Sequence, residues 1–129
     1  MTIHAYRKYT DANISRELHL PDGATELATL DGITYVHLPA NTTLPAEQPA
    51  EIEMVAAAID AALLAAIAAA SPHVRLINAR VCAMIAERYS IGDEIKMLQL
   101  APSVESTAYN DYVKSCRAWG RAKKEAIGL

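Results

Sequence analysis

The residues that could do acid–base, nucleophilic or metal chemistry are few in this 129-residue chain and lie far apart. The four histidines show neither HxH nor HxxxH spacing, the patterns that bring two imidazoles to one metal. His4, His19 and His37 fall in the first third, so a cluster assembled by strands is the alternative to solvated or singly hydrogen-bonded histidines. The chain has no GxSxG elbow and no Gly-rich phosphate loop. The sequence therefore predicts no enzyme, no metal and no cofactor.

The two cysteines, Cys82 and Cys116, lie in stretches with helical periodicity and outside any CxxC pattern. No histidine near them in sequence marks either thiol as a nucleophile. The N-terminal residues are polar and lack the apolar centre of a signal peptide. We therefore expect reduced, buried and unreactive thiols in a protein made in the cytosol, with a disulfide or a ligand pair as the alternative.

Composition favours a globular protein with room for one domain, or one domain and a small appendage. Hydrophobic residues make up 52% of the chain and charged residues 21%, which argues against wholesale disorder. A net charge of -3 gives no field that would attract DNA or anionic lipid. Only 5% of the residues are aromatic and Ala supplies much of the apolar total, so the core should be thin. A thin core is often supplemented by a partner subunit.

The first 45 residues have the pattern of β-structure. Asp31-Gly32 stands between two runs of β-forming residues, and such a pair is the strongest short signal for a hairpin. Pro21-Asp22-Gly23 is a second turn signal. Residues 39–50 hold three prolines and are expected to form an extended linker. The predicted strands lie near 2–8, 14–20, 25–30 and 33–38.

From residue 51 onward, apolar residues recur every three or four positions, which is the period of a helix. Ser-Pro and Pro-Ser pairs and a capping serine interrupt this pattern. The predicted helices cover about 51–70, 72–89, 91–100 and 103–126. The sequence thus predicts an α+β protein that is mostly α. A small β-hairpin or meander region, residues 1–45, is followed by a bundle of about four helices, residues 46–129, with the Pro-rich linker at its start.

The first predicted helix carries bulky residues on one stripe and Ala on its other faces. Ile59, Leu63 and Ile67 belong to this stripe. A helix that is apolar on several sides needs covering on more than one side, which favours an oligomer or partner interface over burial in a monomeric bundle. A membrane span is rejected, because residues 55–70 are too few and include Asp60.

The last predicted helix carries an aromatic face and a basic flank. Tyr109, Tyr112 and Trp119 are expected to dock this helix on the bundle. Arg117 and Arg121 are one turn apart, flank Trp119 and are expected to stay exposed for a partner. A basic face with an aromatic residue also fits nucleic acid, although acidic residues on the same helix offset it. The third predicted helix is expected to bury its own stripe of Ile91, Ile95 and Leu98.

Residues 88–129 resemble the C-terminal part of small proteins encoded beside tail-fibre genes in bacteriophages and prophages. The resemblance is carried by the segments RYSIGDEI, AYNDYV and CRAWGRAKK, and TLDGITYVHLP before a Pro-rich linker fits such proteins loosely. It implies a protein that binds a tail fibre or baseplate protein, as an assembly chaperone or a minor virion component. Such a protein would act in the host cytoplasm during assembly or in the tail of the virion. No catalytic residue comes with the resemblance.

Three hypotheses follow. The first is this tail-associated protein, a homo-oligomer that contacts neither nucleic acid nor membrane. The second is a nucleic-acid-binding regulator that uses the basic C-terminal helix. The third is a small enzyme whose site is assembled from distant residues. The predicted partner-binding residues are Ile59, Leu63, Ile67, Arg117, Trp119 and Arg121.

Overall fold

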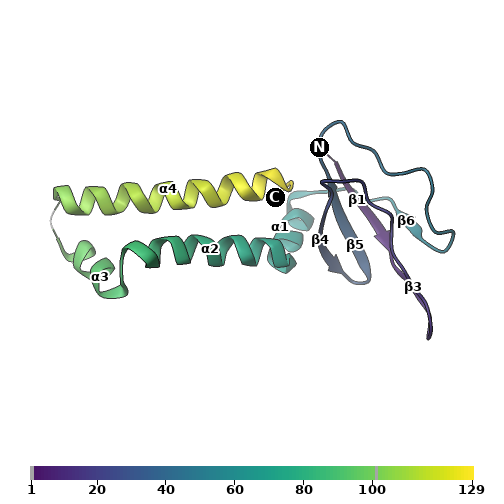
Figure 1. The fold of residues 1–129 in the computed structure, drawn as a ribbon, viewed down its shortest axis with the longest axis horizontal. Helices are drawn as coiled ribbons and strands as arrows, with labels where there is room; N and C mark the ends of the chain where they lie inside the picture. The colour runs from purple at the N-terminus through teal and green to yellow at the C-terminus, as the bar shows by residue number, and fades with distance from the viewer. Residues whose placement is uncertain (1, 101) are drawn as a thin grey trace. The chain divides into compact units, whose positions relative to one another are not determined.

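The computed structural model describes residues 2–100 and 102–129 and divides the chain into two compact units (Figure 1). The sheet unit comprises the residues up to Val74 together with Ala126–Leu129, and the helical unit comprises Arg75–Glu125. The chain leaves the sheet unit through one helix and returns through another. The helical unit is therefore an insertion between the sheet and the last four residues of the sheet unit.

The sheet unit contains two antiparallel sheets. The larger one has four strands in the order β4-β5-β1-β6, and the smaller one pairs β2 with β3. The strands are β1 (Thr2–Arg7), β2 (Tyr9–Thr10), β3 (Ser15–Arg16), β4 (Thr25–Leu30), β5 (Ile33–Leu38) and β6 (Glu53–Val55).

The central hairpin forms at the predicted place. Asp31 and Gly32 turn the chain with φ of 50° and 78°, so that Leu30 pairs with Ile33. Positive φ at both central residues suits the right-handed twist of the flanking strands. The register of β4 and β5 shifts between Glu26 and Ala28. This bulge lets two successive residues of β4 face the same core.

Each face of the larger sheet has its own cover. One face carries the core of Ala5, Leu27, Ala28 and Tyr35, closed by Ile67 of helix α1 (Ala61–Ala70). The opposite face carries Tyr6, Val36 and Leu38, covered by Leu18 and, at its margin, by Leu44 and Ile52. Because side chains alternate along a strand, neighbouring residues of β1 and β5 serve opposite cores.

The helical unit is a hairpin of α2 (Pro72–Arg88) and α4 (Val104–Ala126), joined by the short helix α3 (Ile91–Gln99) (Figure 1). Gly120 lies against Val81, where an added Cβ would come within 2.7 Å of the valine Cγ2. The Tyr112 hydroxyl donates to the Met84 carbonyl at 2.8 Å. These two contacts fix α2 and α4 side by side and antiparallel. A capping box of Ser90 and Asp93 begins α3.

The fold prediction was wrong in two respects. The described chain has more β-structure than predicted, and its four helices do not form one bundle. The described residues form a mixed α+β protein with six strands in two sheets, where a small hairpin or meander of three or four strands was predicted. The predicted strand near 14–20 is reduced to two residues, because Leu18 covers a face of the sheet instead of extending β3. The predicted helix near 51–70 begins only at Ala61, since residues 53–55 pair with β1 as β6.

The boundary between the two units also differs from the predicted one at residue 45. Residues 46–74 belong with the sheet, and α1 packs on the sheet rather than in a helical bundle. The Pro-rich segment is attached to the sheet unit through Gln48. The Gln48 side chain accepts from the His19 backbone N–H at 2.7 Å and donates to the His19 carbonyl at 2.9 Å.

Candidate protein-binding surface

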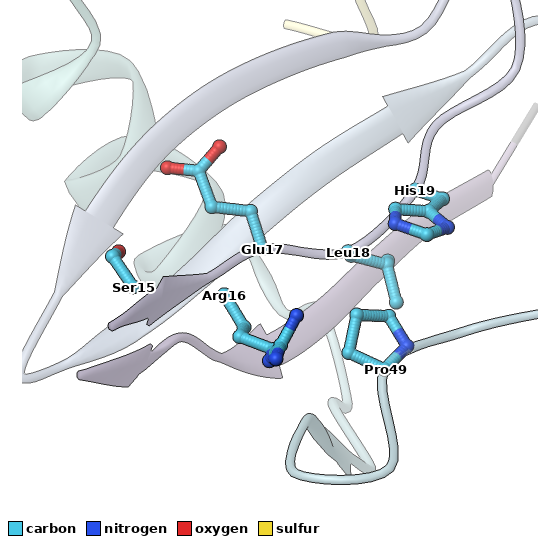
Figure 2. A pocket seen from close by; sticks show the side chains of 6 residues that line it. All are labelled: Ser15, Arg16, Glu17, Leu18, His19 and Pro49. Atoms are coloured by element: carbon cyan, nitrogen blue, oxygen red, sulfur yellow. The ribbon is translucent and has the colours of Figure 1, made fainter. Parts of the chain in front are cut away.

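An open polar hollow on the sheet unit offers no catalytic arrangement. It is open, has a volume of about 540 Å³ and is lined by Ser15, Arg16, Glu17, Leu18, His19 and Pro49 (Figure 2). Arg16 is paired with Glu51 at 3.4 Å. Figure 2 shows the Ser15 and Glu17 side chains pointing away from the His19 ring. In the described part of the chain no three His, Cys, Asp or Glu residues come together to hold a metal ion.

Partly exposed ion pairs of the sheet unit tie strands together. Lys8 Nζ lies 2.8 Å from Glu26 and 3.3 Å from Glu17, which links the end of β1 to β4. The hydrogen bond to Glu26 raises the pKa of Lys8. Burial raises the pKa of the neighbouring Tyr6 hydroxyl. These groups stabilise the sheet, and this structural role explains their positions.

His37 is the one histidine with a distinct environment. It is 3% exposed, and its Nε2 has no hydrogen-bond partner. Gly128 packs against the imidazole, where an added Cβ would lie 2.8 Å from Cδ2. Burial lowers the pKa of His37, which favours the neutral ring. The alternative cluster of His4, His19 and His37 is not assembled as a metal site in the described part of the chain, and His19 is exposed at the surface.

The predicted stripe on the first helix is used inside the chain. Ile67 is fully buried, and Ile59 and Leu63 pack beside it on the core formed with Leu27 and Tyr35. The burial of this stripe therefore needs no partner. A short helix laid on a sheet is covered by the strands beneath it, which sequence periodicity alone did not reveal.

The predicted basic and aromatic residues of α4 do not share a surface. Successive residues of an α-helix are rotated by about 100°, so Arg117 and Trp119, like Trp119 and Arg121, are about 160° apart. Arg117 and Arg121 are exposed on one flank of α4. Trp119 is half-buried on the other flank, with Lys123 Nζ 5.6 Å from its ring centroid. A nucleic-acid surface that combines stacking on Trp119 with both arginines is therefore disfavoured.

The largest departure from expectation is helix α3. Ile91, Ile95 and Leu98 were expected to be buried, yet they are 77%, 51% and 78% exposed. They stand at i, i+4 and i+7 and so form one aliphatic row, which we call the α3 face. Glu94 connects α3 to α4, because its carboxylate accepts a hydrogen bond from the Tyr109 hydroxyl at 2.8 Å. Complete removal of the α3 face from water would contribute roughly 3–6 kcal/mol.

A hollow of about 260 Å³ adjoins the α3 face. It lies between the end of α3 and the first turns of α4. Leu98 belongs to both the α3 face and this hollow, and Leu100, 39% exposed, forms another part of its wall. At the start of α4, Val104 is 87% exposed. A row of exposed aliphatic side chains beside a hollow is a candidate surface for binding another protein.

The two cysteines lie in different environments. Cys116 is buried in the hairpin, as expected, whereas Cys82 is exposed on α2, and neither forms a disulfide. The expectation that both thiols are buried was therefore wrong for Cys82. Its position on a helix pattern could not reveal which side of α2 faces α4.

Comparison with known proteins adds no relative: no family model, no curated protein and no solved structure matches this chain. Among the described residues, no single helix is long and apolar enough to cross a bilayer. Of the helices that the structure describes, only α1 and α2 taken together, with a bend between them, have the length and composition for it.

Proposed function

We propose that this chain is a bacteriophage tail-associated protein that binds a tail fibre or baseplate protein, as an assembly chaperone or a minor virion component, without catalysis. The observation that carries the proposal is the α3 face, a row of three large aliphatic side chains left in water. The tail setting is supported by the resemblance of residues 88–129, the segment that contains α3 and α4.

The chemistry of the α3 face defines what it would bind. Anchors at i, i+4 and i+7 suit an apolar groove, and the adjoining hollow can receive one aliphatic side chain in return. The tail protein would therefore contribute an apolar segment rather than a charged one. Arg117 and Arg121, exposed on a flank of α4, would add attraction to an acidic rim of that protein.

Capture of tail proteins tests the proposal. The full chain, immobilised, would be offered the purified tail fibre and baseplate proteins of the virus that encodes it. Leu98→Lys places a charge in the centre of the contact and should weaken capture at least about tenfold. Ile14→Lys makes the same kind of change at an exposed aliphatic residue of the sheet unit and should leave capture unchanged.

Two results decide the proposal and its two forms. If the wild-type chain captures no tail protein, or captures it equally well with Leu98→Lys, the proposal is wrong. Mass spectrometry of purified virions then separates the forms. A minor virion component is present in fixed copy number, whereas a chaperone is absent from the finished particle.

A further inference from the structure

The segment that follows α4, residues 127–129, packs on the sheet unit and covers one of its histidines. Ile127 and Leu129 both pack against the core that α1 closes. Gly128, between them, lies on the His37 ring, where an added Cβ would be 2.8 Å from Cδ2 and 3.5 Å from Nε2. The φ of Gly128 is 83°, a conformation that glycine adopts without strain. The absence of a side chain thus allows the backbone to touch the imidazole.

His37 is surrounded by side chains that cannot neutralise a charge. It lies two residues from Tyr35 on β5, so both side chains point to the face that α1 covers. Its neighbours in register are Ile3 of β1 and Thr25 of β4. Helix α1 contains only Ala, Leu and Ile. The titratable groups of these elements are therefore the Tyr35 hydroxyl, the amino terminus and the Leu129 carboxylate.

A positive charge on His37 is unfavourable while the segment is in place. The side chain is 3% exposed, and protonation would turn the unpartnered Nε2 into a charged N–H donor without an acceptor. Burial, and next the positive amino terminus, lower the pKa of His37, and the Leu129 carboxylate does not offset them. The docked segment therefore favours the neutral ring.

Of the groups around the ring, residues 127–129 can move away with the least loss of structure. The flanking strands β1 and β4 are paired with β5, and α1 holds the fully buried Ile67 against the sheet. Residues 127–129, by contrast, belong to no helix or strand, and each of them is only partly buried. Segments with few buried contacts open at the lowest free energy.

We propose that protonation of His37 releases residues 127–129 from the sheet, which makes this segment an acid-sensitive attachment for the end of α4. At neutral pH the uncharged ring tolerates the backbone of Gly128 against it. As the pH falls, the charged ring gains water only when Gly128 moves away. The inference concerns a different part of the molecule from the α3 face and does not depend on the proposed function.

Nuclear magnetic resonance of the isolated full chain between pH 7.5 and 5.0 tests the release, since carboxylates stay mostly ionised in this range. The imidazole signals of His37 report its protonation, and the methyl signals of Ile127 and Leu129 report the segment. We expect these methyl signals to shift to the positions of a solvated chain with the same midpoint as His37. The methyl signals of Ile67 should stay in place. His37→Gln should make the Ile127 and Leu129 signals independent of pH.

Gly128→Ala tests the same coupling in the opposite direction. The added Cβ would clash with the ring and should displace the segment even at neutral pH, so that His37 titrates near its ordinary pKa of about 6.5. Gly32→Ala is the matched control. Gly32 also has a positive φ, of 78°, but its added Cβ would meet only the end of the Arg7 side chain, at 3.6 Å. This control should keep the wild-type midpoint of His37.

Four results would each overturn the proposal. His37 could stay neutral down to pH 5.0, or it could become protonated while the methyl signals of Ile127 and Leu129 do not shift. The signals of Ile67 could shift together with those of Ile127, which would mean that the sheet unit unfolds as a whole. Finally, Gly128→Ala could leave the titration of His37 unchanged.

Discussion

The sheet unit and the helical unit bury their apolar residues to different extents. Ten of the twelve buried hydrophobic residues in the described chain lie in the sheet unit, and only Val113 and Cys116 lie in the helical unit. Conversely, six of the nine exposed large hydrophobic residues lie in the helical unit. The sheet unit therefore closes its own cores, whereas the helical unit leaves several large aliphatic side chains exposed.

The helical unit is held by a few specific contacts rather than by a wide core. A narrow inner stripe, the Tyr112–Met84 hydrogen bond and the capping box at Ser90 define its geometry. Regions with few buried apolar contacts open at lower free energy than a closed core. We expect the helical unit to be the first to open and to gain most from a bound partner.

The largest expected effect breaks the closed core of the sheet unit. Ile67→Ala removes a fully buried side chain from beneath the sheet and should lower the free energy of unfolding by about 2–5 kcal/mol. Leu98→Ala makes a similar truncation at a side chain that is 78% exposed and should stay within about 0.5 kcal/mol of wild type. Urea unfolding of both variants measures the contrast. If both variants lose the same free energy of unfolding, the two units do not differ in how well they bury their apolar side chains.

The next effect probes the close approach of the two long helices. Gly120→Ala places a Cβ 2.7 Å from the Val81 side chain, which cannot move aside freely, and should cost about 1–3 kcal/mol. Gly92→Ala is the control, because its nearest neighbour is 3.8 Å away and Ala favours a helix over Gly. Thermal melts should show Gly120→Ala destabilised and Gly92→Ala unchanged or stabilised. A neutral Gly120→Ala would mean that the helices lie farther apart.

A smaller effect concerns the cap that positions the α3 face. The Ser90 hydroxyl accepts from the Asp93 backbone N–H at 3.1 Å, and the Asp93 carboxylate accepts from the Ser90 N–H at 3.0 Å. Ser90→Ala should cost about 1 kcal/mol, and Ser90→Thr should retain most of the cap. Hydrogen exchange of the α3 amides is the measurement, with faster exchange expected only in Ser90→Ala. Unchanged protection would show that α3 is held by other contacts.

The smallest effect is a pH dependence confined to the sheet unit. Burial lowers the pKa of His37 in the folded chain below its value of about 6.5 in an unfolded chain. The unfolded state therefore takes up the proton first as the pH falls. The stability associated with neutral His37 is complete above about pH 6.5 and decreases at lower pH.

Urea unfolding between pH 7.5 and 5.5 checks this sign, since carboxylates stay mostly ionised in that window. His73, exposed at the start of α2, supplies the control: His73→Gln should keep the slope, and His37→Gln should reduce it. If the pH dependence of stability disappears with His73→Gln and persists with His37→Gln, the assignment of the proton uptake to His37 is wrong.

Local signals placed many of the elements. The Asp31-Gly32 pair predicted the hairpin of β4 and β5, which is confirmed with the expected bounds. Ser and Pro signals predicted helices near 72–89, 91–100 and 103–126, and α2, α3 and α4 match these ranges within one or two residues. Turn residues, caps and apolar periods act within a few positions along the chain, so their effect can be read directly from the sequence.

What covers each apolar face was decided only by the tertiary structure. Ile67 and Leu98 both stand on apolar helical stripes, yet one is fully buried by the sheet and the other is 78% exposed. Burial of apolar surface is non-directional and depends on which elements meet in space. The sequence by itself determined where apolar faces form, and packing determined which of them remain for a partner.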